Sequence, residues 1–248
     1  SAGLAIVGRY YQARRHEPGL ALALTSTAQM IAFALVAAPL SYIAASAGLP
    51  LRDGTFVAWD QWLGFDWMMV LAAMNAHPVL HQLCALAYAS FPIQVTTIIL
   101  ALAWAGQFAR LQAFLLAFIA TTLVTIAGSA IVPAQGVWGH FSLSQADYPA
   151  IAPITQTVHL PIFHGLRDGT LRVLSGSDAE GIITFPSLHA ALGLLFILAM
   201  WRVRYLRWAA LVVNLLMIAA TPVDGGHYFV DVIAGLVIAA ACWAGIAR

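Results

Sequence analysis

Two short segments in the last third of the chain place a histidine where a turn-rich stretch enters a long apolar run. The later segment reads Gly225-Gly226-His227-Tyr228-Phe229-Val230-Asp231. His227 and Asp231 are at positions i and i+4, so a helix that begins near Tyr228 puts both on one face. Helical side chains lean toward the N-terminus, which brings the Asp231 carboxylate back toward the imidazole. The spacing therefore predicts a histidine that is oriented by a carboxylate.

The earlier segment, Phe185-Pro186-Ser187-Leu188-His189, is typical of a helix start because proline fits the first helical turn. Ser187 and His189 are then expected where unpaired N–H groups and the positive helix end attract anions. Gly226 lets a bulky anion approach the backbone before His227. An oriented imidazole serves as a general base, a metal ligand or a nucleophile, and these anion-binding features indicate a phosphate as the target. The alternative for each histidine is a packing role inside a membrane.

These segments carry a family resemblance. Pro186-Ser187-Leu188-His189 resembles the second signature (Pro-Ser-x-His) of the type 2 phosphatidic acid phosphatase (PAP2) superfamily, and the stretch from Gly226 to Asp231 resembles the His-x-x-x-Asp end of the third. The resemblance covers mainly residues 167–235. It implies a membrane enzyme with six helices that cleaves phosphoesters through a phosphohistidine, with no metal and no cofactor.

The chain departs from the family pattern at two places. It contains no lysine, so the first signature has no counterpart, and Thr221 stands where an arginine is expected. With Gly165-Leu166-Arg167-Asp168-Gly169, these departures resemble the branch that contains inositol phosphorylceramide synthase and its bacterial relatives. A bidentate guanidinium suits a phosphate, so Arg167 is expected as a ligand. The other expected phosphate-binding residues are Ser187, Gly226 and Arg172, with a salt bridge to Asp168 or Asp178 as the alternative for Arg172.

The composition indicates a membrane protein. The 248 residues are 62% hydrophobic and 8% charged, with a mean hydropathy of +0.86, which excludes a soluble domain with a polar surface. We therefore expect one all-α domain over residues 1–248, a polytopic membrane protein with six transmembrane helices. The expected spans are Leu20–Ala47, Leu80–Ala105, Leu111–Val132, Ile182–Trp201, Trp208–Pro222 and Tyr228–Ile246.

The arginines predict the orientation in the membrane. With the N-terminus inside, the outer side receives only Arg52, Arg167 and Arg172, and the cytoplasmic side receives all the others. Residues 1–19 are then a cytoplasmic lead-in, and residues 133–181 form a loop on the outer face. The expected location is the bacterial inner membrane, with the active site facing the periplasm. A net charge of +1 and the lack of a basic patch give no sign of nucleic acid binding.

The predicted function is that of an integral membrane phosphoesterase or phosphotransferase acting on a lipid phosphate. His227 attacks phosphorus, Asp231 holds its tautomer, and His189 exchanges protons with the leaving group and the acceptor. Transfer of a phospho-headgroup between lipids is one alternative, and non-enzymatic transport of lipids or small molecules is another. The expected partners are a lipid phosphate or phospholipid substrate and the bilayer, and the sequence leaves the oligomeric state open.

Overall fold

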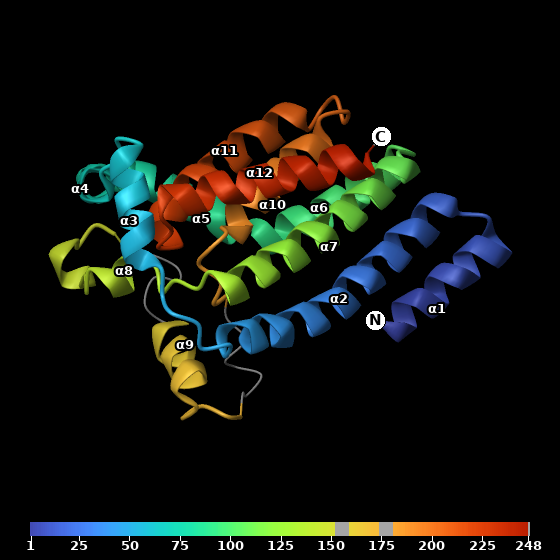
Figure 1. The fold of residues 1–248 in the computed structure, drawn as a ribbon. Coiled ribbons are helices and arrows are strands. Elements are labelled where there is room, and N and C mark those ends of the chain that lie inside the picture. The colour runs from blue at the N-terminus through green and yellow to red at the C-terminus, as the bar shows by residue number, and fades with distance from the viewer. Residues whose placement is uncertain (152–158, 174–180, 248) are drawn as a thin grey trace.

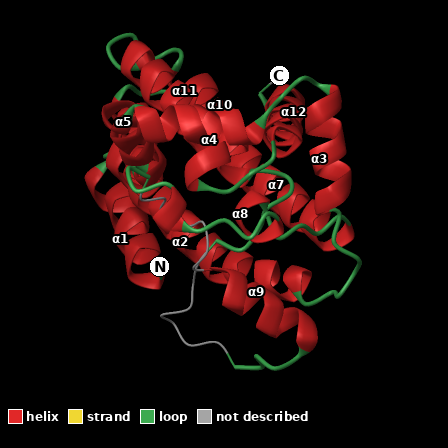
Figure 2. Cartoon of the chain, turned by 90° about the vertical axis from the view of Figure 1, so that its left-hand side faces the viewer, coloured by secondary structure: helices red, strands yellow, loops and turns green. Residues whose placement is uncertain are grey.

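The computed structural model describes residues 1–151, 159–173 and 181–247, and in these ranges the chain is all-α, without a strand. The long helices run lengthwise through the molecule, and the short helices α3, α8 and α9 gather at one end (Figure 1). Figure 2 views the molecule from that end, where loops join the short helices to the long ones. Segments 152–158 and 174–180 of the expected outer loop lie outside the described residues.

The helices divide into long apolar ones and short ones at the ends. The apolar group is α2 (Pro18–Ala45), α5 (Pro78–Ala89), α6 (Phe91–Trp104), α7 (Phe108–Ile131), α10 (Leu188–Met200), α11 (Arg207–Asp224) and α12 (Phe229–Ile246). The shorter ones are α1 (Ala2–Tyr10), α3 (Asp53–Trp62), α4 (Trp67–Ala76), α8 (Val137–His140) and α9 (His159–Asp168), with a π-helical turn at Tyr11–Arg15 and a 3₁₀ turn at Gln145–Asp147.

Among the described residues, four helices are long and apolar enough to cross a membrane: α2, α7, α11 and α12. A fifth candidate arises if α4 and α5, which are bent by 108° at their junction, count as one span. These findings support an all-α integral membrane protein. The expected number of six spans is not confirmed.

The two expected spans that differ most from the structure contain proline. The span Leu80–Ala105 is divided into α5 and α6 at Ser90, because Pro92 in the first turn of α6 has no N–H to continue the preceding helix. The span Ile182–Trp201 is helical only from Leu188, after Pro186. Helix α10 has 13 residues, fewer than the roughly 20 that a full crossing needs.

The expected N-terminal lead-in is helical. Helix α1 and the π-helical turn fold back along α2 (Figure 1). Gly8 allows this contact, because a Cβ there would lie 2.9 Å from Thr25 Cγ2 and 3.1 Å from the Ala21 carbonyl oxygen. This part of the chain thus packs on the first long helix, and its cytoplasmic location stays a prediction.

Helix α10 is the centre of the bundle. It contacts α6, α7, α11 and α12. Leu192, Leu195 and Phe196 are fully buried, and the helix is apolar all round, as expected for an element enclosed by others. His189, in the first turn of α10, is therefore carried by the most enclosed helix of the bundle.

Helices α10 and α12 approach each other closely at Gly235. A Cβ at this position would clash with the Ser187 carbonyl oxygen and would lie 3.3 Å from the Ala191 nitrogen. Both neighbours are backbone atoms, which cannot rotate aside as a flexible side chain does. A glycine is therefore required where the helix that follows His227 crosses the start of the helix that carries His189.

We expect Gly235→Ala to destabilise the protein by roughly 1–3 kcal/mol, the usual cost of overpacking a core. Gly245→Ala on the same helix is the matched control, because a Cβ there meets nothing within 4 Å. The control should be neutral or stabilising by up to about 1 kcal/mol, the helix preference for alanine. Thermal unfolding in detergent micelles measures both variants. Equal midpoints for Gly235→Ala and the wild type would contradict the close approach.

Candidate active site

A backbone hydrogen bond joins the two histidine segments. The Ser187 amide donates to the Asp231 carbonyl oxygen at 3.0 Å. The Ser187 hydroxyl caps α10 by accepting from the Ala190 amide at 3.3 Å. The first turns of α10 and α12 are thereby fixed side by side, and the structure brings His189 and His227 into one site.

His227 follows a tight turn at the end of α11. Gly226 has a positive φ of 65°, a conformation that glycine adopts without strain. The Thr221 carbonyl accepts from the Gly225 amide at 3.1 Å and from the His227 amide at 3.3 Å. His227 Nδ1 lies 3.5 Å from Asp231 Oδ2, so the two side chains are close, as expected. The expected reason, a shared helix face, is wrong, because α12 begins at Phe229 and the extended Tyr228 separates His227 from the helix. The distance is within ion-pair range but is long for a hydrogen bond.

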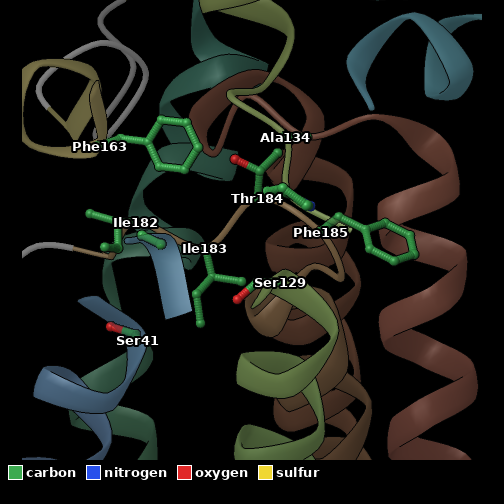
Figure 3. A pocket seen from close by; sticks show the side chains of 10 residues that line it. Ser41, Ser129, Ala134, Phe163, Ile182, Ile183, Thr184 and Phe185 are labelled. Carbon is green, nitrogen blue, oxygen red and sulfur yellow. The ribbon is translucent and has the colours of Figure 1, made fainter. Parts of the chain in front are cut away.

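Burial controls the charge of His227. The side chain is 3% exposed, and burial lowers its pKa to about 4. A hydrogen bond with the Thr184 backbone partly opposes this lowering. Thr184 belongs to the segment Ile182 to Phe185, which Figure 3 shows together with Ser41 of α2, Ser129 of α7 and Phe163 of α9. His227 is thus neutral at physiological pH and has a nitrogen lone pair for attack.

His189 is held by aromatic rings. The Tyr88 ring stacks on the His189 ring, with centroids 4.0 Å apart and an interplanar angle of 15°. Phe91 meets the same ring edge-on at 5.5 Å. Tyr88 also lies near the turn before His227, since a Cβ on Gly225 would be 2.9 Å from the Tyr88 hydroxyl oxygen. Helix α5 therefore contacts both halves of the site.

The turn between α11 and α12 is held by donors from α4 and α8. The Trp67 indole donates to the Pro222 carbonyl at 3.2 Å, and the Trp138 indole donates to the Val223 carbonyl at 3.1 Å. The Val137 amide donates to the Gly226 carbonyl at 2.9 Å. Carbonyls that the end of α11 leaves unpaired are thus satisfied by distant segments.

Carboxylates from α3 hold the start of α12. Asp60 accepts from the Phe229 and Val230 amides, both at 2.9 Å. Burial raises the pKa of Asp60, and these two hydrogen bonds act against that shift. Asp53 accepts from the Tyr228 hydroxyl at 2.9 Å, and burial and the Asp53 charge both raise the Tyr228 pKa, which keeps this donor protonated. The first turn after His227 is therefore anchored by a short helix at the end of the molecule.

Both site histidines line a cavity of about 550 Å³. Its other walls are mainly apolar side chains of α2, α6 and α7, including Phe33, Val95 and Phe118. The lining residues Ile31, Ala34 and Ala38 of α2, and Pro92 and Thr96 of α6, are exposed, so the cavity opens on the side of the bundle between these helices. The site thus combines two imidazoles with space for a long apolar group.

The structure does not bring the expected phosphate-binding residues to this cavity. Ser187 is fully buried and caps a helix, and the Gly226 carbonyl accepts a hydrogen bond from the Val137 amide.

The two expected arginines bind other groups. Arg167 on α9 donates to the Leu49 carbonyl and lies 5.3 Å from the Phe163 ring centroid. Arg172 is exposed and donates to the Gly169 carbonyl at 3.1 Å. None of the four expected phosphate-binding residues lines the cavity, and Asp178, an alternative partner for Arg172, lies outside the described residues.

Sequence reasoning missed three residues that the structure places in or beside the site. Tyr88 and His159 line the cavity, and His81 Nε2 lies 3.3 Å from Asp224 Oδ1 in a second buried histidine–aspartate pair. Because Asp224 precedes Gly225-Gly226-His227 directly, this pair ties α5 to the site turn. His81 and Tyr88 are seven residues apart on an apolar helix, a spacing that could have indicated a shared buried face.

A protein-family model described as the PAP2 superfamily matches residues 54–245, which is more than three quarters of the chain. The matched range includes both histidine segments and Asp60 of α3, but it begins one residue after Asp53. Searches of curated proteins and of solved structures gave no match. The match supports the superfamily and does not distinguish the branch that contains inositol phosphorylceramide synthase.

We expect the His227 ring to stay neutral between pH 5 and pH 8. Its lowered pKa means that the ring is half protonated near pH 4, whereas an ordinary histidine is half protonated near pH 6.5. NMR of protein with ¹³C-labelled histidine, with the signal assigned by its loss in His227→Asn, measures this directly. Free histidine in the same buffer is the reference. A His227 midpoint near 6.5 would show that the ring is hydrated and not enclosed.

Proposed function

The chain belongs to the PAP2 superfamily, and from this premise we propose that it is a membrane enzyme that cleaves or transfers a phosphoryl-linked group on a lipid, with His227 as nucleophile. The observation that carries the proposal is the placement of His189 and His227 in one cavity whose other walls are mainly apolar. Phosphoryl chemistry needs a nucleophile and an acid on the two sides of phosphorus, and a lipid tail needs an apolar channel.

The first half-reaction transfers the phosphoryl group to the enzyme. A lone pair of the neutral His227 ring attacks phosphorus, and the P–N bond forms as the P–O bond to the leaving alkoxide breaks. His189 donates a proton to that alkoxide. Asp231, 3.5 Å from His227 Nδ1, stabilises the positive charge that the ring gains.

The second half-reaction restores the enzyme. His189 takes a proton from an acceptor hydroxyl, the acceptor oxygen bonds to phosphorus, and the electrons of the P–N bond return to His227. Water as the acceptor gives a phosphatase, and a lipid alcohol gives a headgroup transferase. The resemblance to the branch that contains inositol phosphorylceramide synthase, carried by Gly165 to Gly169 and by the missing first signature, favours the second outcome. Neither route assigns a step to a metal ion.

We further propose six crossings, with the site at the outer face. Helices α2, α7 and α11 end at the site, and α10 and α12 begin there, so these elements alternate in direction. The consecutive helices α5 and α6 complete the set: His81 pairs with Asp224 at one end of α11, and Gln94 accepts from Asn214 farther along it. The arginine asymmetry supports a site on the outer side, which we propose is the periplasmic side of a bacterial inner membrane.

The roles of the two histidines are tested by rapid-quench labelling with a lipid phosphate in the presence of EDTA. His227→Ala should form no acid-labile phosphoenzyme. His189→Ala should lose roughly 10²–10⁴-fold in rate with an alkyl leaving group, and much less with p-nitrophenolate, which departs without a proton. The exposed His140→Ala is the control.

Two outcomes of this experiment would contradict the proposal. Phosphoenzyme in His227→Ala and none in His189→Ala would reverse the roles of the histidines. If the wild type releases no phosphate and transfers none to an alcohol, while intact lipid crosses liposomes, the protein is a transporter.

The apolar cavity is tested by filling its opening. Ala38→Trp should lower turnover of a long-chain lipid phosphate at least tenfold, because an indole at the opening occupies the space of the tail. Turnover of water-soluble p-nitrophenyl phosphate should change little. Leu35→Trp is the matched control, since Leu35 lies on the same helix, is 69% exposed and does not line the cavity. An equal loss of turnover with both substrates would show that the lipid tail does not occupy this opening.

A further inference from the structure

The cavity lacks the cations that usually hold a phosphate. The chain has no lysine, and among the residues that the structure describes no arginine lines the cavity. Arg167 donates to the distant Leu49 carbonyl, and Arg172 donates to the Gly169 carbonyl three residues before it. A phosphoryl group in this site nevertheless needs donors for its non-bridging oxygens, because an anion without partners in an apolar cavity is strongly destabilised.

A third histidine enters the same cavity from a separate element. His159, at the start of α9, is 6% exposed and lines the cavity together with His189 and His227. These three histidines come from α9, α10 and the turn before α12, so the fold and not the local sequence brings them together. Histidines are rarely buried without a role, and here all three face one apolar space.

The packing of α9 explains why His159 faces inward. Phe163, one helical turn after His159, is buried in a cluster with Tyr42 and Ala45 of α2 and with Ile182. Residues at i and i+4 share a face of a helix, so this cluster also directs His159 inward. His164 lies on the opposite, exposed side of the same helix.

We propose that His159 is a phosphate ligand that replaces the missing lysine and arginine of the family signatures. An imidazole donates one N–H when neutral and two when protonated, so it can bind a non-bridging phosphoryl oxygen in either state. His227 and His189 are then left for nucleophilic attack and proton transfer. This assignment rests on the proposed function, because it requires a phosphoryl group in the cavity.

The test is binding of tetradecylphosphonate, whose P–C bond the enzyme cannot cleave, to purified protein in micelles. His159→Leu, which removes the N–H donor, should weaken binding roughly tenfold to a hundredfold, the range for losing a hydrogen bond to a charged group. His164→Leu on the same helix should bind like the wild type. Tetradecanol, which has the same tail and no charge, should bind His159→Leu and the wild type equally if the variant is folded.

The outcomes separate this inference from the proposed function. Wild-type affinity for the phosphonate in His159→Leu would overturn the inference, as would a loss that occurs only in Arg167→Leu, the rival ligand. Equal weakening of phosphonate and tetradecanol in His159→Leu would also overturn it, because His159 would then only shape the cavity. A phosphonate site that depends on His159 in a wild-type protein without turnover would support the inference and reject the proposed catalysis.

Discussion

The site depends on how the backbone amides at the start of α12 are satisfied. A helix leaves its first N–H groups without partners, and in an apolar surrounding each unpaired group costs roughly 1–3 kcal/mol. Asp60 accepts from two of these amides, and Asp231 accepts from the Tyr228 amide at 2.9 Å. Because Asp231 also lies 3.5 Å from His227 Nδ1, the carboxylate that completes the helix start is the one that faces the His227 ring.

This constraint explains why short helices collect at one end of the bundle. Helix α3 supplies Asp53 and Asp60, α4 supplies Trp67, and α8 supplies Trp138, and each meets the turn between α11 and α12 through a hydrogen bond. The long helices bury apolar surface, whereas the short ones satisfy polar backbone. Rigid support of this kind fixes the positions of His189 and His227 relative to each other.

Local sequence predicted those parts of the site that lie within one helical turn. The proximity of His227 and Asp231 and the start of α10 after Pro186 were expected from spacing and helix-end chemistry, although His227 itself precedes α12. Asp60, Tyr88 and His159 are distant in sequence from the two histidine segments, and only the packing of helices brings Asp60 to the start of α12 and Tyr88 and His159 to the cavity. Arg167 suited a phosphate by its chemistry alone, but the register of α9 directs it to the Leu49 carbonyl. The number of spans was hard to predict because proline divides apolar runs that hydropathy treats as continuous.

The opening between α2 and α6 has a consequence for how the protein would meet a lipid. A molecule that enters there arrives from within the leaflet, so its encounter rate depends on two-dimensional diffusion and on its mole fraction among neighbouring lipids. The lipid concentration in bulk water then does not determine how far the site is saturated with lipid. Detergent dilutes the lipid surface, and it would lower apparent affinity without changing a single contact in the site.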